Sequence, residues 1–361
     1  MRLPGSVAAV LLSVAFLRPA LAEPPVAPTE TVAEANDACL GCHSDPSLTL
    51  TLGDGTVRPL AVDPNHLARS VHGGELRCIE CHPGMEEMPH PEKKFPDTYA
   101  LRAAMGEVCK TCHQTNAAHA KDGVHESLRA AGDRRAPTCV DCHGSHDVAR
   151  PHMPRSRIST TCARCHQAEY GKYAASVHGR ALIEERNQDV PTCTDCHRSH
   201  DIQDPRTREW QLQVPEMCGR CHADPQLAAR YGMSPNVLRT YLADFHGMTA
   251  SLQKKQNGNG KGGAVTALCT DCHGIHDIAH PGLPGSTTHA NLTSSCTKCH
   301  PDATPEFPAA WLSHYDPSWS KAPVVHAVRV AYRILIPVVL AGLLLQIAIH
   351  VRRFVMARAR R

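Results

Sequence analysis

Hydrophobic and polar residues are mixed along most of the chain, and long apolar runs occur near its two ends, at Val7–Leu17 and Ile334–Ile349. Between these runs, helical spacing of apolar residues extends over short stretches, which frequent prolines separate into loops and turns. Short helices are expected around 68–71, 101–109, 168–176, 227–240 and 250–253. Thr49–Thr56, with Gly53-Asp54-Gly55 near its centre, is expected to form a small hairpin. The pattern predicts a mainly α chain with extensive loops.

The N-terminal apolar run has the layout of a secretory signal. Arg2 precedes the run, and the small residues of Ala20-Leu21-Ala22 follow it, as a cleavage site requires. The run is too short to span a bilayer. Residues 1–22 are therefore predicted to be a signal peptide that is cleaved after Ala22, which would deliver the mature chain to the periplasm.

The C-terminal apolar run predicts one transmembrane helix over 323–351, reached through a linker over 304–322. Its uncharged centre, Ile334–Ile349, would span roughly 24 Å as a helix, which long flanking side chains can extend. Five arginines follow within 352–361, so the positive-inside rule places this basic tail in the cytoplasm. His326 and His350 flank the helix, either as interfacial residues or as parts of a quinol or partner site.

All 18 cysteines fall into nine copies of Cys-x-x-Cys-His. This spacing is the attachment site of c-type haem, in which two thiols bond to the porphyrin and the histidine binds iron as the proximal ligand. A disulfide framework or a zinc site would not place a histidine after every second cysteine. Nine covalent haems are therefore predicted. The attachment residues are Cys39, Cys42, Cys78, Cys81, Cys109, Cys112, Cys139, Cys142, Cys162, Cys165, Cys193, Cys196, Cys218, Cys221, Cys269, Cys272, Cys296 and Cys299. The proximal histidines are His43, His82, His113, His143, His166, His197, His222, His273 and His300.

Composition agrees with a core built largely from cofactor. Aromatic residues make up 4% of the chain, which is too few large apolar side chains for a conventional core of this length. Porphyrin would supply the missing apolar bulk. The formal charge of +3 does not indicate nucleic-acid binding, because each haem would add two propionates.

The motifs belong to an internal repeat. Each repeat begins with Val-His or Phe-His and then carries two haem motifs. Four dihaem repeats, numbered 1 to 4 below, are predicted over 67–113, 119–166, 172–222 and 240–300, after a lone lead haem over 36–66. Together they would form a nonahaem domain over 23–303, organised as a modular multihaem array.

Sixteen of the 25 histidines remain after the nine proximal ones. A haem used for electron transfer takes a protein ligand on each face of the iron. Each repeat begins with a lead histidine, and repeats 2 to 4 add a post-motif histidine three residues after their first proximal histidine. The distal candidates are His72, His90, His125, His146, His178, His200, His246 and His276. The post-motif histidines His146, His200 and His276 are expected to bind a neighbouring haem, because their own haem's distal face lies opposite the proximal ligand.

Two ligand positions stay open at this point. Repeat 1 has no post-motif histidine, and His90 competes there with Met85 and Met88. The ninth distal ligand is undecided among His66, His119 and His314. The aspartates that follow the post-motif histidines, such as Asp277, either accept the second imidazole N–H or stabilise a turn.

The Ser-Val-His-Gly segments at 70–73 and 176–179 and the Cys-x-Asp-Cys-His-x-x-His-Asp sequences at 139–147, 193–201 and 269–277 resemble those of multihaem c-type cytochromes of bacterial respiratory chains. The resemblance covers about residues 36–302. It implies a periplasmic domain, tethered to the cytoplasmic membrane and its lipid, that passes electrons to soluble or outer-membrane cytochromes or to other periplasmic and extracellular acceptors. The donor would be the quinol pool, a membrane quinol dehydrogenase or a b-type cytochrome, with electrons entering near the Cys296–His300 motif. The C-terminal anchor departs from the best-known quinol dehydrogenases of this group, which are anchored at the N-terminus.

A second class of function stays open beside the electron carrier. A multihaem reductase of nitrite, hydroxylamine or a sulfur oxyanion would need one haem with an open distal face and nearby proton donors. Repeat 1, which lacks the post-motif histidine, is where such a haem is expected. The surplus of histidines favours an electron-transfer component over a stand-alone enzyme.

Overall fold

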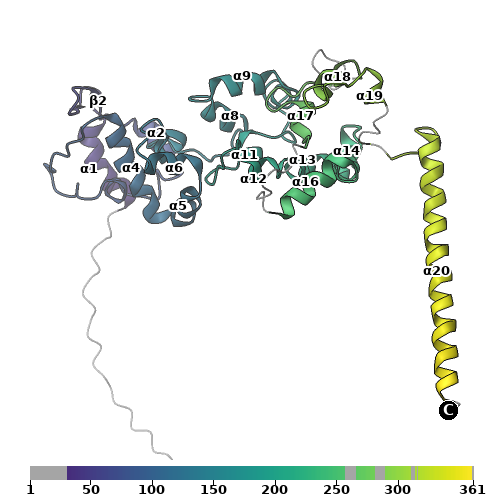
Figure 1. Ribbon diagram of the computed structural model, residues 1–361. Helices are drawn as coiled ribbons and strands as arrows, with labels where there is room; N and C mark the ends of the chain where they lie inside the picture. Colours follow the sequence, from purple (N-terminus) through teal and green to yellow (C-terminus); the bar gives the residue numbers. More distant parts are fainter. Residues whose placement is uncertain (1–30, 257–265, 281–288, 310–313, 315, 360–361) are drawn as a thin grey trace, which may run out of the picture. The chain divides into compact units, whose positions relative to one another are not determined.

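The computed structural model describes residues 31–256, 266–280, 289–309, 314 and 316–359, and these form helices joined by loops together with one pair of short strands (Figure 1). The expected mainly α fold with extensive loops is confirmed. The chain divides into two compact units, the first ending at Lys94 and the second beginning at Phe95. This division falls inside the predicted repeat 1, 67–113. The predicted signal peptide, 1–22, lies outside the described residues.

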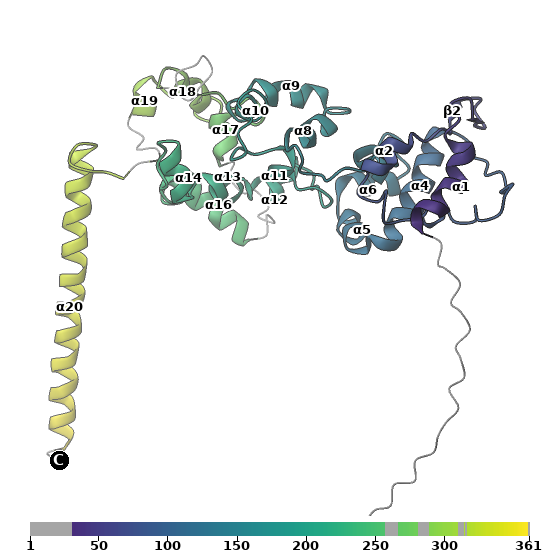
Figure 2. The ribbon, with the colours of Figure 1, turned by 180° about the vertical axis from the view of Figure 1, so that it is seen from behind.

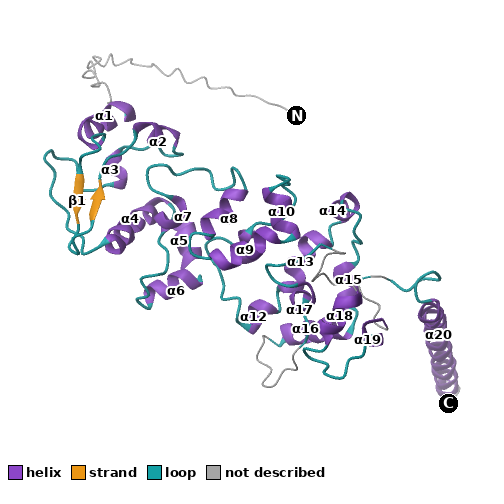
Figure 3. Ribbon diagram, turned by 90° about the horizontal axis from the view of Figure 1, so that it is seen from above, coloured by secondary structure: helices purple, strands orange, loops and turns teal. Residues whose placement is uncertain are grey.

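The first compact unit carries the lead motif and the first motif of repeat 1. Its helices are α1 (Val32–His43), α2 (Pro64–Arg69) and α3 (Cys78–Cys81). The strands β1 (Thr49–Thr51) and β2 (Val57–Pro59) pair antiparallel, which confirms the expected hairpin (Figure 3). Gly55 adopts a φ of 84° in the turn, a conformation that glycine reaches without strain.

Asn36 fixes α3 against α1 in this unit. The side chain is buried, donates to the carbonyl of Leu76 at 3.2 Å and accepts from the Cys78 N–H at 2.8 Å. Because Cys78 is the first residue of a haem motif, one amide from the lead-motif helix sets the position of the next motif.

The second compact unit, seen from two sides in Figures 1 and 2, carries the remaining seven motifs on helices and the loops between them. Its first helices are α4 (Thr98–Cys112), α5 (Gln114–Lys121), α6 (Val124–Ala130), α7 (Cys139–His143), α8 (Ser156–Cys162), α9 (Gln167–Ala175) and α10 (Val177–Ile183). The later ones are α11 (Cys193–His197), α12 (Arg208–Gln211), α13 (Val214–His222), α14 (Pro225–Arg230), α15 (Val237–Leu242), α16 (Phe245–Lys255), α17 (Cys269–His273), α18 (His289–Cys296), α19 (Glu306–Ala309) and α20 (Pro323–Ala359).

One expected helix is wrong in extent. The span 227–240 was predicted as one helix, but the chain leaves α14 after Arg230 and starts α15 at Val237. Gly232 lies between them with a φ of 64°, and Pro235 follows it. A left-handed residue and a proline both interrupt the hydrogen-bond ladder, so the apolar spacing continues across a break in the backbone.

The first motifs of the repeats form short helices that an acidic residue caps. Asp195 lies between the cysteines of α11, and its Oδ2 accepts from the Thr192 N–H at 2.6 Å and from the Thr192 hydroxyl at 2.8 Å. Asp141 accepts from the Thr138 N–H at 2.7 Å in the same way at α7. The acid of Cys-x-Asp-Cys-His therefore holds the turn of backbone that presents both thiols and the histidine.

An arginine in the second motif of a repeat ties it to the first motif. Arg164 donates to the carbonyl of Asp141 at 2.7 Å, and Arg220 donates to the carbonyl of Asp195. Each arginine directly precedes the second cysteine of its motif. This repeated contact holds the two motifs of repeats 2 and 3 against each other.

Protein side chains alone make a small core in the described residues. The buried apolar side chains include one cluster of Leu212, Ala250 and Leu268. Large apolar side chains beside haem motifs remain exposed, with Phe245 84% and Ile275 61% accessible. A flat apolar cofactor lying between the motif helices would cover surfaces of this kind.

The last helix, α20, differs from the others in its length and in its exposed apolar surface. It runs for 37 residues from Pro323 to Ala359, continues through Pro337, and exposes apolar side chains on all sides. Among the described residues it is the one helix long and apolar enough to cross a membrane. A helix that is apolar all round suits a lipid environment.

Candidate haem-binding sites

The candidate sites are built from the motif helices and from histidines that other segments bring to them. All 18 cysteines lie in the described residues, none forms a disulfide, and each is exposed or half-buried. Their thiols are therefore accessible for bonding to a cofactor.

Within repeats 2, 3 and 4, the lead histidine lies opposite the second proximal histidine of the same repeat. The ring centroids are 6.3 Å apart for His125 and His166, 6.2 Å for His178 and His222, and 6.4 Å for His246 and His300. Each lead histidine is the second residue of its helix, α6, α10 or α16, so a repeated local structure aims the three rings.

Two of the post-motif histidines lie opposite proximal histidines of the preceding repeat. His200 of repeat 3 faces His143 of repeat 2 at 6.0 Å, and His276 of repeat 4 faces His197 of repeat 3 at 5.9 Å. Both rings thus lie against a motif other than the one they follow in the sequence. Ligation itself stays a prediction.

Backbone hydrogen bonds fix this offset between repeats. The Val124 N–H donates to the Ile202 carbonyl at 2.7 Å, and the Val177 N–H donates to the Ile278 carbonyl at 2.9 Å. Each valine precedes a lead histidine, and each isoleucine lies two residues after a post-motif histidine of the next repeat. One contact therefore positions both kinds of candidate ligand.

Two further pairs involve histidines that the sequence left undecided. His90 faces His43 of the lead motif, with centroids 6.1 Å apart, and His314 faces His273 at 6.0 Å. His66, a rival for the ninth position, instead lies 3.7 Å from Asp63 on the exposed surface of α2.

The described pairs therefore include seven of the nine proximal histidines. They leave open which residues lie opposite His82 and His113, and what the candidates His72 and His146 bind.

The spacing of the rings is what one iron between two histidines requires. A metal–imidazole bond is about 2 Å long, so two rings on opposite faces of one iron have centroids roughly 6 Å apart. Direct packing of two neutral rings has no reason to repeat this spacing seven times. The residues therefore fit haem with two axial histidines, one on each face.

Burial favours the neutral, metal-binding form of some of the paired imidazoles. It lowers the pKa of His125, His143, His197 and His273 below the ordinary value. Burial together with the adjacent His222 lowers the pKa of His178 to about 4. A neutral imidazole has a lone pair for a metal, whereas the protonated ring has none.

Cysteine contacts show that the seven motifs of the second compact unit form one continuous series. Contacts between second and first motifs of successive repeats join Cys109 to Cys139, Cys162 to Cys193, and Cys218 to Cys269. Within repeats, Cys142 neighbours Cys165, Cys196 neighbours Cys218, and Cys272 neighbours Cys296. In the first compact unit, Cys39 contacts Cys78. Motifs that follow each other in the sequence therefore also lie side by side within each unit.

The aspartate after the post-motif histidine of repeat 4 stabilises a turn. Asp277 Oδ1 accepts from the Ile275 N–H at 3.2 Å, and it lies over Gly274, whose φ is 82°. Asp201 instead forms an ion pair with the guanidinium of Arg198, which has a φ of 64°. Of the two roles expected for these residues, the structure shows the turn for Asp277.

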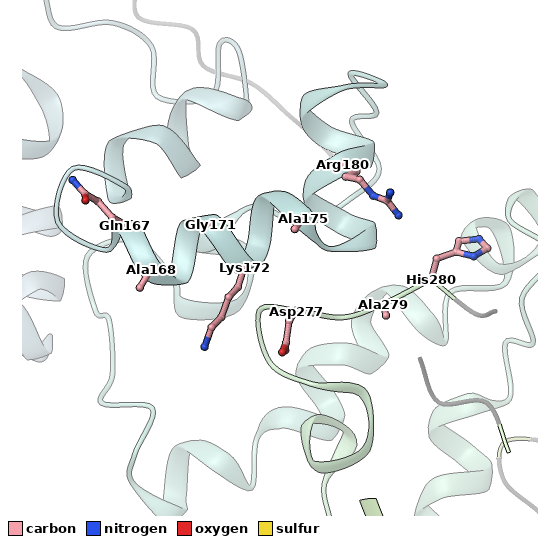
Figure 4. A pocket seen from close by; sticks show the side chains of 9 residues that line it. All are labelled: Gln167, Ala168, Gly171, Lys172, Ala175, Arg180, Asp277, Ala279 and His280. Carbon is pink, nitrogen blue, oxygen red and sulfur yellow. The ribbon is translucent and has the colours of Figure 1, made fainter. Parts of the chain in front are cut away.

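A cavity of about 650 Å³ lies between α9, the start of α10 and the segment after α17 (Figure 4). Lys172 and Asp277 both line it, and Arg180 and His280 lie at the end away from Gln167. Asp277 directly follows the candidate ligand His276. Two cationic side chains at this place suit the propionates that a haem carries.

Three aromatic or cationic features beside the motifs were not predicted from the sequence. Trp210 stacks on His197, with centroids 5.5 Å apart and planes 6° from parallel. Phe307 lies 5.3 Å from His300, and Lys172 lines the cavity. No sequence pattern distinguishes them, because each reaches its motif from a different helix and none of the three recurs from one repeat to the next.

In the described parts of the chain, no group of three or more His, Cys, Asp or Glu side chains is arranged as a metal cage. Zinc sites of the structural type need four such ligands around one point.

A model of the doubled CXXCH motif matches residues 131–170 and 186–227, which contain two pairs of the motif. These doubled motifs indicate a c-type multihaem cytochrome. One matched segment contains both motifs of repeat 2 and the other contains both motifs of repeat 3, so the matches agree with the repeat described above. No curated protein and no solved structure shows significant similarity to the chain.

Proposed function

We propose that this multihaem cytochrome is a membrane-tethered electron conduit of the periplasm, carrying nine haems with two axial histidines or a comparable closed ligand set. The observation that supports it most is the recurrence of facing histidine rings at 5.9–6.4 Å beside motif cysteines. Bound haem supplies one-electron oxidation and reduction. The chain's residues attach it, hold both faces and set its surroundings.

The continuity of the motifs supports conduction. In the second compact unit, cysteines of successive repeats contact one another and cysteines of the two motifs within repeats 2 to 4 lie near each other, so cofactors attached there would lie beside one another. No side chain has to break or form a bond in such a carrier. Rigid ties such as Arg220 to the Asp195 carbonyl keep the attachment points fixed while charge moves.

The expected donors and acceptors are those that the resemblance to multihaem cytochromes implies. A membrane helix would bring the chain beside a donor in the membrane, either the quinol pool or a b-type cytochrome. Periplasmic, soluble or outer-membrane cytochromes would take the electrons. The basic residues after the apolar run favour a cytoplasmic C-terminus.

The test uses the full-length protein from a host that attaches c-type haem. We expect a mass above that of the processed chain by about nine haems, and a spectrum of low-spin iron. Carbon monoxide added to the reduced protein, and nitrite or cyanide added to the oxidised one, should leave that spectrum unchanged.

Two results would contradict the conduit. Absence of a Soret band would mean that the protein carries no haem. A high-spin fraction that binds nitrite would instead favour the reductase of nitrite, hydroxylamine or a sulfur oxyanion, because one haem would then have an open face.

A further inference from the structure

The pairing of first proximal histidines with post-motif histidines of the next repeat cannot continue beyond repeat 4. The first proximal histidine of repeats 2 and 3 faces the post-motif histidine of the next repeat, His200 or His276. Repeat 4 has no repeat after it. Its first proximal histidine, His273, faces His314 instead, a residue of the linker that leads to α20.

The geometry of this last pair matches the others. The centroids of His273 and His314 are 6.0 Å apart, and the ring planes differ by 22°. His314 is half-buried and has a φ of 48°, a left-handed conformation that histidine adopts more readily than most residues. Such a conformation is retained where surrounding contacts require it.

Residues that follow His314 bind the linker both to α15 and to α20. Asp316, two residues after His314, forms ion pairs with Arg239 of α15 and with Arg329 of α20, the latter at 3.2 Å. His326 of α20 donates from Nδ1 to the Pro317 carbonyl at 2.8 Å and packs edge-on against Trp319. The linker is therefore bound to the haem domain and to the start of α20 within a few residues of His314.

We propose that His314 is the distal ligand of the haem attached at Cys269 and Cys272. The inference rests on the proposed function only in requiring that this motif carries haem. The segment that enters the membrane helix would then supply an axial ligand, which makes this haem the one coupled to the anchor. The sequence led us to expect that electrons enter near the Cys296–His300 motif, whereas this assignment points to the neighbouring haem at Cys269 and Cys272.

The position of Cys269 in the series gives this assignment a consequence. Cys269 contacts Cys218 of repeat 3, and Cys272 neighbours Cys296. Electrons that arrive through the anchor-coupled haem would therefore meet two neighbouring haems, one toward the rest of the array and one at its end.

The experiment compares full-length haem-loaded variants His314→Ala and His314→Met with His66→Ala. Loss of the ligand in His314→Ala should convert about one-ninth of the haem to a high-spin form that binds carbon monoxide when reduced. In His314→Met the same fraction should stay low-spin, with His/Met absorption in the near-infrared and a raised potential for one haem. His66 was another candidate for the ninth distal ligand and lies on the exposed surface beside Asp63, so His66→Ala should keep the wild-type spectra.

The outcomes separate this inference from the conduit. A wild-type protein without haem would contradict both the conduit and the assignment of His314. A fully loaded, low-spin wild type whose spectra are unchanged in His314→Ala would overturn the assignment and leave the conduit standing. If the alanine variant does not accumulate, unchanged near-infrared spectra in His314→Met would overturn it equally.

Discussion

In repeats 1, 3 and 4 the lead histidine is followed by a glycine, which the close approach of two stretches of backbone requires. A Cβ built on Gly179 would lie 1.9 Å from the carbonyl oxygen of Tyr173, and one on Gly247 would lie 2.0 Å from that of Tyr241. Gly73 meets Leu67 in the same way at 1.8 Å. These glycines follow the lead histidines directly, so any added side chain would push the candidate ligand out of place.

Gly179→Ala should therefore destabilise the haem-loaded protein by about 1–3 kcal/mol, the usual cost of overpacking. Gly171→Ala is the matched control on α9, because its Cβ would meet nothing within 4 Å. The control should be neutral or slightly stabilising, since alanine favours a helix over glycine. Chemical denaturation followed by far-ultraviolet circular dichroism measures both, and equal stability of the two variants would refute the steric account.

The sequence predicts which histidines are candidate ligands better than it predicts which histidine each of them faces. The repeat of lead and post-motif histidines was visible, because the residues recur at fixed offsets from each motif. The partner of each histidine was not, since His200 and His143 belong to different repeats and meet through the Val124–Ile202 hydrogen bond. His314 was one of three open choices because it belongs to no repeat at all.

The short motif helices are stabilised at their first turn more than by their length. A helix of five residues such as α11 has few internal hydrogen bonds, so its cap decides whether it forms. Asp195 supplies that cap and also pairs with Arg155, Nη2 to Oδ2, at 2.7 Å. The sequence predicted helices from apolar spacing and missed these, since their stability comes from polar contacts.

Asp195→Ala should lower the free energy of unfolding by about 1–3 kcal/mol, through the lost cap and an unpaired Thr192 N–H. Asp204→Ala removes a partly exposed carboxylate that bonds Arg206 and serves as the control, with a much smaller effect expected because solvent screens this pair. Thermal unfolding monitored at the Soret band distinguishes them. A control as damaging as the cap variant would mean that the effect is not specific to the motif helix.

At the scale of the whole molecule, the apolar helix and the motif-bearing domain call for different surroundings. α20 exposes apolar side chains along its length, whereas the haem domain carries many exposed ion pairs such as Arg135 with Asp133. Length, charge and the position of apolar runs were enough to predict this division. The break between Lys94 and Phe95 was not predictable, because it lies inside a repeat whose motifs look alike in the sequence.

The predicted topology can be tested on spheroplasts that carry the full chain with a C-terminal epitope. Protease added outside should remove the haem-staining domain and leave a small membrane-bound fragment that retains the epitope. Lysed spheroplasts provide the control, in which the epitope should also be lost. Loss of the epitope in intact spheroplasts would place the C-terminus on the outer side.

The offset between repeats would bear on how the protein matures if it is exported as its N-terminal apolar run predicts. A chain translocated from its N-terminus would expose His143 well before His200, and His197 well before His276. If these histidines bind the same iron, the first motif of each of these repeats would have to wait, after its thiols have reacted, for a later stretch of chain to complete its coordination. If His314 completes the series, the final bond to iron would form only once synthesis has reached the anchor, so that insertion into the lipid and closure of the last site would be parts of one event.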